Sequence, residues 1–369
     1  MRLRRPAPEA RRPGRRCKPG AAAGLFAALL LPPAIPSASA QTLTVATWAL
    51  YQDALRRLYF HPFAEATGIA VHDVARAPGI GQLRALAEGA ASPGGPAPRL
   101  PWDLAEVEGD EALLGCGEGL FERIDWNRLG GKDHYLPAGV SDCGVGALAY
   151  DVILAWDRDK LPATPSWSDF WDIAKYPGKR GLRASPRTNL EIALLADGVA
   201  PGDVYSTLRS DAGVERAFRK LDQLKPYVVW WNAPEEPAKL LGSGEVLMTT
   251  SPNGPIVDAD REGGRHFGIQ WNNSLAAVDF WAILKNSPNT DAAYSLLGFM
   301  GEPEREAQLE ATIPYSGLAK GAGDKLSPEA LENSPAAPAH QKAALPIDEA
   351  FWKDNLDRLT QRFNAWLAH

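Results

Sequence analysis

The stretch from residue 266 to residue 285 has two largely apolar segments separated by a short polar run. It predicts two short strands, residues 267–271 and 278–284, which are rich in β-branched and aromatic side chains. A polar turn at residues 272–274, with the sequence Asn-Asn-Ser, separates the two predicted strands.

Asp279 lies between Val278 and Phe280, in a run that otherwise reads as buried. An unpaired charge inside a protein is energetically expensive, so this carboxylate needs a partner. An ion pair within the core satisfies that need, and so does a bound cation in a cleft.

Strands and helices alternate in the first part of the chain. The pattern predicts strands at 42–48, 69–76 and 102–107, and helices at 52–67, 79–89 and 110–115. This order is typical of a parallel sheet with helices packed on both faces.

Residues 143–156 form a long apolar segment that reads as one strand, and a second α/β unit follows it. Its predicted strands are 181–184, 227–231 and 246–250, and its predicted helices are 167–173, 189–196, 214–225 and 237–242. Helices at 291–300, 302–311 and 350–368 end the chain. One long strand leads from the first α/β unit into the second, and another leads back. This arrangement indicates two hinged lobes with a ligand between them.

Residues 1–40 have the features of a cleaved signal peptide. Residues 2–18 contain eight Arg or Lys and one acid, an apolar run covers 21–31, and Ser-Ala-Ser-Ala precedes Gln41. The apolar run is too short to anchor the chain in a bilayer. Arg15 and Arg16 leave the twin-arginine route open, although their neighbours fit that signal poorly. We therefore expect an exported, periplasmic protein.

Removal of this segment changes the charge of the chain. Lys plus Arg falls from 39 to 31 and Asp plus Glu from 45 to 44, so the net charge moves from −6 to −13. Such a chain is a poor nucleic-acid binder and favours cationic small molecules, although solubility alone accounts for the charge equally well.

Cys116 and Cys143 are the cysteines that remain after export. A disulfide is the default in an oxidising compartment, and this one would add roughly 3–4 kcal/mol in the chain-entropy model. No cluster of His or Cys accompanies them, so we expect no metal and no cofactor.

Segments along nearly the whole mature chain resemble the spermidine/putrescine-binding family, periplasmic solute-binding proteins of ABC importers. Each is weak alone, and their common order and spacing carry the resemblance. The segments include LTVATWALY (43–51), WDLAEVEGDEALLGCGEGLFERIDW (102–126), SDCGVGALAYDVILAW (141–156), PSWSDFWDIAKYPGKRGLR (165–183), GSGEVLMTTSPNG (242–254), VDFWAILKNSPN (278–289) and IPYSG (313–317).

The resemblance implies an α/β fold of the type II periplasmic-binding-protein class, with two lobes joined by two crossing strands and a ligand cleft between them. Residues 41–150 with 279–320 would form lobe 1, and 151–278 lobe 2. Residues 321–369 would be a C-terminal helical segment that packs on the lobes. A monomer of this type captures a small amine-bearing, polyamine-like solute by hinge closure and delivers it to a membrane permease.

An alkylammonium ligand needs aromatic faces for cation–π contact and carboxylates for its hydrogen bonds. The resemblance and this chemistry together give eight candidate ligand-binding residues: Trp48, Tyr51, Glu108, Asp110, Asn189, Asp279, Tyr315 and Trp352. Trp231 and Trp281 lie in apolar runs and fit a core role better. Asp110 could simply be an acid favoured at a helix start.

The second lobe departs from the polyamine pattern. The polyamine binders carry two acids where this chain has Pro186 and Asn189, and a tryptophan where it has Pro252. Arg183 and Arg187 lie close by and could hold an anionic group at a helix start. A zwitterionic, amino-acid-like or carboxylate solute is therefore an alternative to a polyamine.

Other functions have less support. The six His form no motif, and no nucleophile elbow or phosphate-binding glycine loop is present, so we do not expect an enzyme. Glu108 and Asp110 could still serve as the paired carboxylates of a hydrolase. A ferric-ion carrier is a rival within the same architecture, but the chain lacks the adjacent tyrosines that such carriers tend to use.

Overall fold

The computed structural model describes residues 41–90 and 100–369, and these residues belong to one compact unit. The predicted signal peptide, residues 1–40, lies outside the described residues. No helix in the described ranges combines the length and the apolar composition needed to cross a membrane.

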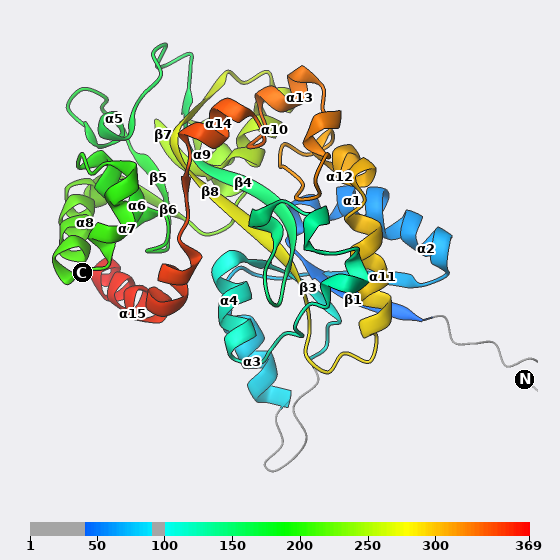
Figure 1. Cartoon of the computed structure of the whole chain (residues 1–369). Helices are drawn as coiled ribbons and strands as arrows, with labels where there is room; N and C mark the ends of the chain where they lie inside the picture. The colour runs from blue at the N-terminus through cyan, green and yellow to red at the C-terminus, as the bar shows by residue number, and fades with distance from the viewer. Residues whose placement is uncertain (1–40, 91–99) are drawn as a thin grey trace, which may run out of the picture. The chain divides into compact units, whose positions relative to one another are not determined.

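The strands of the described residues form one mixed sheet of nine strands (Figure 1). They are β1 (Thr42–Thr47), β2 (Ala70–Ala75), β3 (Leu104–Glu108), β4 (Val145–Asp157), β5 (Arg180–Arg183), β6 (Val228–Trp231), β7 (Met248–Pro252), β8 (Phe267–Ile283) and β9 (Leu345–Pro346). Their order is β2-β1-β3-β8-β4-β7-β5-β6, and β9 pairs with β8.

The sheet is parallel toward its two ends and antiparallel in its centre. β1 pairs in parallel with β2 and β3, and β5 pairs in parallel with β6 and β7. In the centre, β8 runs antiparallel to β3 and β4, and β4 runs antiparallel to β7. The predicted α/β class is confirmed, and the two parallel parts are joined through β4 and β8.

β4 and β8, of 13 and 17 residues, lie side by side through the middle of the sheet (Figure 1). Both sequences are largely apolar, because these strands are covered on both faces. β8 pairs with β3 near its end, and β4 pairs with β7 near its own end. Each central strand therefore contributes to both parts of the sheet.

The predicted turn at residues 272–274 is wrong, because β8 is continuous. Residues 271–274 bulge opposite the single residue Ile153 of β4. Asn273 has a φ of 58°, a left-handed conformation that asparagine adopts more readily than most residues. The polar run thus forms a bulge inside one strand, and the strand continues in the same direction.

Helices occupy most of the connections between the strands. They are α1 (Gln52–Leu55), α2 (His61–Thr67), α3 (Gly81–Ala90), α4 (Gly109–Gly117), α5 (Trp167–Trp171), α6 (Asn189–Ala196), α7 (Val204–Leu208), α8 (Asp211–Leu224), α9 (Glu236–Ser243), α10 (Asn253–Gly263), α11 (Thr290–Met300), α12 (Pro303–Glu310), α13 (Pro328–Glu332), α14 (Pro338–Ala343) and α15 (Glu349–Ala368). A π-helical turn, Arg56–Phe60, links α1 to α2. The sequence did not predict α7, α10, α13 or α14.

Short 3-10 turns complete the described chain. They are Ala49–Tyr51, Trp126–Leu129, Lys132–His134, Pro137–Gly139, Pro201–Asp203, Lys225–Tyr227 and Gly323–Lys325. The first of these follows β1 directly and carries Tyr51.

The C-terminal helix α15 contacts elements from both parts of the sheet. Phe363 packs against Phe218 of α8, and Trp366 packs against Trp230 of β6, with ring centroids 6.5 and 5.9 Å apart. Asp357 forms an ion pair with Arg84 of α3 at 3.2 Å. At the start of α15, Glu349 lies against α4, where a Cβ at Gly109 would be 2.6 Å from its side chain.

The predicted disulfide is present between Cys116, in the last turn of α4, and Cys143, just before β4. It joins two segments that are 27 residues apart. Trp231 and Trp281 are both buried, which agrees with the core role that their apolar surroundings predict.

Candidate ligand-binding site

The ends of β3 and β8 bring three carboxyl groups together. Glu108 and Asp279 are direct partners in the antiparallel ladder, and Glu106 pairs with Trp281 two positions away. Side chains two residues apart on a strand share a face, and direct partners also share one. Glu106, Glu108 and Asp279 therefore lie on the same face of the sheet.

Asp279 is almost completely buried, at 6% exposure. Its Oδ2 accepts a hydrogen bond from the indole nitrogen of Trp48 at 2.7 Å, and its Oδ1 is buried without a hydrogen-bond partner among the described residues. Burial raises the pKa of Asp279 well above its usual value, and the charges of Glu106 and Glu108 raise it further. The arrangement seen here therefore favours the protonated form of this carboxyl group, and a cation beside it would lower its pKa.

Trp48 is held in place by its backbone as well as by its ring. Its amide donates to Oε2 of Glu106 at 3.2 Å, and the guanidinium of Arg76 lies 4.5 Å from the centre of its ring. Burial raises the pKa of Glu106 to about 7, although the Trp48 amide and the charge of Arg76 oppose the shift. Arg76 is itself paired with Glu111 at 2.8 Å.

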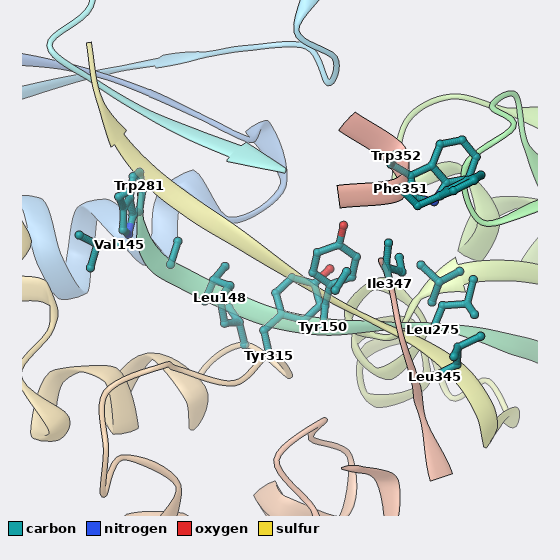
Figure 2. Packing of buried hydrophobic residues seen from close by; sticks show 14 of the residues in the cluster. Val145, Leu148, Tyr150, Leu275, Trp281, Tyr315, Leu345, Ile347, Phe351 and Trp352 are labelled. Carbon is teal, nitrogen blue, oxygen red and sulfur yellow. The ribbon is translucent and has the colours of Figure 1, made fainter. Parts of the chain in front are cut away.

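Tyr51 and Tyr315 pack together with a third tyrosine, Tyr150 of β4. The rings of Tyr51 and Tyr315 meet edge to face with centroids 5.1 Å apart, and those of Tyr150 and Tyr315 are 5.9 Å apart. Figure 2 shows Tyr150 and Tyr315 next to each other along the central strands. The hydroxyl of Tyr51 donates to Asp258 of α10 at 2.9 Å. A Cβ at Gly254 would lie 2.4 Å from this hydroxyl, so the contact requires glycine there.

Glu108 links the acidic cluster to two arginines, Arg183 at the end of β5 and Arg187 just before α6. Its Oε1 accepts from Arg183 and its Oε2 from Arg187, both at 2.9 Å. Arg187 also donates to Glu349 at 2.7 Å. Burial raises the pKa of Glu108, but the two guanidinium groups outweigh it and lower the pKa to about 2. Glu108 is therefore ionised at neutral pH.

Asn189 and Asp110 have supporting positions in this arrangement. Asn189 is fully buried, and its amide nitrogen donates to the carbonyls of Arg183 and Ser185 at 2.6 and 2.8 Å, so it shapes the loop that carries the arginines. Asp110 is buried at the start of α4, with its Oδ1 3.7 Å from Nε of Arg187. Burial raises the pKa of Asp110, and Arg187 opposes that shift.

The structure does not bring Trp352 into this cluster. Its side chain is fully buried on α15, and its indole nitrogen donates to Oε1 of Glu191 at 2.6 Å. Figure 2 shows it beside Phe351, and their ring centroids are 5.3 Å apart. Trp352 therefore belongs to the contact between α15 and α6 in this conformation.

Four residues of the site were not predicted from the sequence: Arg76, Tyr150, Asp258 and Glu349. Tyr150 lies in a strand that reads as uniformly buried, and Asp258 lies on the unpredicted helix α10. Arg76 directly follows β2, and Glu349 is an ordinary first-turn acid of α15.

A cavity of about 470 Å³ lies beside α4 and α15. Its lining includes Gly109, Cys116, Arg123, Phe280, Glu349 and Lys353. None of the eight predicted ligand-binding residues lines it. Seven of the eight, Trp352 excepted, take part in the contacts described above. Trp48 binds Asp279, and Tyr51 packs on Tyr315. Glu108, Asp110 and Asn189 each lie against Arg183 or Arg187.

Residues 59–339 match the family described as bacterial extracellular solute-binding protein. The chain is 38% identical to the gamma-aminobutyric acid-binding protein of Pseudomonas aeruginosa over 337 residues, which cover 91% of this chain and 93% of that protein. It is 29% identical to the spermidine/putrescine-binding periplasmic protein of Escherichia coli over 224 residues, or 58% of this chain and 62% of that protein.

The fold is also similar to solved structures. The Atu4243-GABA receptor superposes with a TM-score of 0.77 and 27% sequence identity, over 89% of this chain and 98% of that one. Such matches confirm the predicted two-lobed fold of periplasmic binding proteins for the described residues. The family consists of solute-binding proteins, so a hydrolase based on Glu108 and Asp110 is excluded. The chain belongs to the bacterial extracellular solute-binding proteins.

Proposed function

We propose that this protein is the periplasmic solute-binding component of an ABC importer, and that its ligand is a zwitterionic ω-amino acid of the 4-aminobutyrate type. Among the relatives, the one that binds gamma-aminobutyric acid covers 91% of the chain. The one that binds spermidine and putrescine covers 58%. The amino-acid-like solute, which the departures in the second lobe already allowed, is therefore better supported than a polyamine.

The observation that carries the proposal is the placement of a carboxyl group, Asp279, and a guanidinium group, Arg183, on either side of Glu108. Asp279 is its ladder partner and has one oxygen without a hydrogen bond. Arg183 is its ion-pair partner, 19% exposed at the side chain. A guanidinium has five N–H donors, so Arg183 can bind Glu108 and still receive a second carboxylate. An ammonium group at Asp279 and a carboxylate at Arg183 would match both ends of the ligand.

Arg187 fits a structural role better. Its side chain is 2% exposed, it binds Glu108 and Glu349, and its Nε faces Asp110. Three carboxyl groups therefore already surround this guanidinium. We assign the ligand's carboxylate to Arg183 and the support of that position to Arg187.

The aromatic residues would cover the carbon chain of the ligand. Trp48, Tyr51 and Tyr315 adjoin the acids, and a chain of methylene groups packs well on such surfaces. Export through a signal peptide, a monomeric state and delivery to a membrane permease complete the proposal. They rest on the features of residues 1–40 and on the family.

The proposal is tested by calorimetry on the mature protein from Gln41. Four ligands with the same number of carbon atoms distinguish the contribution of the ammonium group from that of the carboxylate: 4-aminobutyrate, butyrate, butylamine and putrescine. We expect 4-aminobutyrate to bind at least roughly tenfold more tightly than each of the others, because only it completes both charged contacts. Tighter binding of putrescine would favour the polyamine reading, and binding of none of the four would overturn the proposal.

An Arg183→Gln variant tests the carboxylate end. It should weaken 4-aminobutyrate binding about 10- to 100-fold and leave butylamine binding nearly unchanged, because one charge-assisted contact is lost. Arg123→Gln is the matched control, since Arg123 is 77% exposed and pairs only with Asp142 among the described residues. Equal losses for both ligands would contradict the assignment.

A further inference from the structure

Glu108 is an anion of the protein itself beside the position where the ligand's carboxylate is proposed to bind. Each of its oxygens accepts a hydrogen bond from a different arginine, Arg183 and Arg187. Its side chain is 12% exposed, so the three charges lie in a weakly hydrated environment. Charges in such surroundings interact strongly, so the net charge of these three groups determines whether a charged group of a ligand is attracted or repelled.

The charge around the arginines depends mainly on Glu108. Glu349 and Asp110 also approach Arg187, at 2.7 and 3.7 Å. Burial raises the pKa of Glu349 to about 8 and also raises the pKa of Asp110, whereas the pKa of Glu108 is lowered to about 2. Glu108 is thus the carboxylate of the three whose ionised form is favoured, and it is also the one that binds both guanidinium groups. Counting Glu108 with these two guanidinium groups leaves a single spare positive charge.

Glu108 also acts on the other end of the site. It lies directly opposite Asp279 in the ladder between β3 and β8, and its charge is one of the causes that raise the pKa of Asp279. A negative charge at this position favours an ammonium group beside Asp279. It repels a carboxylate placed there.

We infer that Glu108 is a specificity-determining residue that admits one carboxylate and one ammonium group and excludes dicarboxylates. The inference rests on the proposed function, because it takes Arg183 as the contact of the ligand's carboxylate. Two features exclude a dicarboxylate. The charge of Glu108 repels a carboxylate beside Asp279, and the single spare positive charge of the arginines balances only one carboxylate. Specificity often depends on such an unfavourable contact with the wrong ligand.

The substitution Glu108→Gln removes the charge and keeps the shape. A glutamine side chain can accept from one arginine, but its NH₂ group would face the donors of the other. The variant should therefore leave one guanidinium free and remove the repulsion near Asp279. Both changes favour a second carboxylate.

The experiment compares 4-aminobutyrate with glutarate, in which a carboxylate replaces the ammonium group. Calorimetry should show that glutarate affinity relative to 4-aminobutyrate rises at least about tenfold in Glu108→Gln. Glu108→Asp keeps the charge and should retain the preference of the wild type. Glu118→Gln removes an equal charge at the other end of α4, where Glu118 binds Arg84, and should also retain it. Circular dichroism and thermal melting verify that each variant folds.

The outcomes separate the inference from the proposed function. If the wild type binds no 4-aminobutyrate, both are overturned. If the wild type binds it and Glu108→Gln loses affinity for every ligand without gaining glutarate, Glu108 contacts the ligand's amine and the inference alone is overturned. A gain of glutarate binding in Glu108→Asp as well would show that geometry rather than charge sets the preference, which also overturns the inference. Should Glu108→Gln fail to fold, Glu108→Ala takes its place with the same expected gain of glutarate binding, and an unchanged preference in that variant overturns the inference.

Discussion

Asp279 is the residue whose ionisation would change most on binding an amine. In the described structure it is a buried acid with a raised pKa, and its one hydrogen bond comes from Trp48. An ammonium group in contact with it would favour the ionised form, because an opposite charge lowers the pKa of an acid. The amine would therefore displace a proton as it binds.

Replacing Asp279 by Asn tests this role. We expect about 10- to 100-fold weaker binding of 4-aminobutyrate, the value of one charge-assisted hydrogen bond, and no loss of fold because Asn has the same shape. In the wild type, affinity should increase with pH, since the proton leaves Asp279 on binding. Titrations in buffers with different ionisation enthalpies measure the proton release.

The Asp279→Asn variant also distinguishes Asp279 from a second acid nearby, Glu106. Burial raises the pKa of Glu106 to about 7, so Glu106 is a competing source of the proton. Proton release that persists in Asp279→Asn would identify Glu106 as that source. Unchanged affinity in the variant would remove Asp279 from the site.

At the scale of elements, α12 holds the loop that carries Tyr315. Glu306 and Glu310, one turn apart on this helix, accept hydrogen bonds from the amides of Ala319 and Gly317 at 2.6 and 2.7 Å. A Cβ on Gly317 would lie 2.2 Å from Glu306 Oε2, so this close approach requires glycine. Burial raises the pKa of Glu306 to about 8 and that of Glu310 to about 7.

These two acids make stability fall as pH rises. In the unfolded chain a glutamate titrates near pH 4.3, so between about pH 4.3 and 8 the folded state holds protons that the unfolded state has lost. Their stabilising effect is complete at the acidic end of this range and is lost as pH passes the folded pKa values. We expect the melting temperature to decrease from pH 6 to pH 9, and Glu306→Gln and Glu310→Gln to reduce that slope.

Glu304→Gln is the matched control on the same helix. Glu304 is 68% exposed and pairs with Lys325, and its pKa is lowered rather than raised. Thermal melts across this pH range should show the wild-type slope for this variant. A wild-type slope in both buried variants would contradict the assignment.

The elements that the sequence predicts well are those with local patterns. β4 is apolar apart from Asp151 and its last residue, Asp157, and the helix that Asn189 begins has the same bounds in the prediction and in the structure. β8 was misread because the polar run at residues 272–274 is typical of a turn, and only pairing with β4 shows the bulge. α10 was missed because Asn253, Gly254 and Pro255 are poor helix formers, while the packing of Tyr51 and Tyr315 on Gly254 depends on tertiary structure.

The same distinction holds for the site. Glu106 and Glu108 alternate along one strand, so the sequence shows that they share a face. Arg183, the partner of Glu108, is 75 residues beyond it, and Asp258 is 207 residues from Tyr51, so only the topology of the sheet shows these contacts. Trp352 is an aromatic residue of the kind expected in a ligand site, but the packing of α15 against α6 buries it.

For the molecule as a whole, the site is made of contacts between the two parts of the sheet. Tyr51 follows β1 and binds Asp258 of α10, and Glu108 at the end of β3 binds Arg183 at the end of β5. These partners surround the position proposed for the ligand, so a ligand enters only when they separate. The lobes of residues 41–150 with 279–320 and of residues 151–278 would separate by bending of β4 and β8. Both strands have bulges, near Gly146 and Ile153 of β4, where the ladder is interrupted and bending is easiest.

Hinge motion should therefore accompany binding. In the absence of ligand we expect a mixture of open and closed molecules, and 4-aminobutyrate should shift it toward the closed form, because only that form completes both charged contacts. Small-angle scattering measures the shift as a smaller radius of gyration at saturating ligand, with butyrate at the same concentration as the control. Tyr51→Phe, which lacks the hydrogen bond to Asp258, should have a larger ligand-free radius than the wild type. If 4-aminobutyrate binds by calorimetry and the radius does not change, β4 and β8 are not a hinge and the ligand enters by another route.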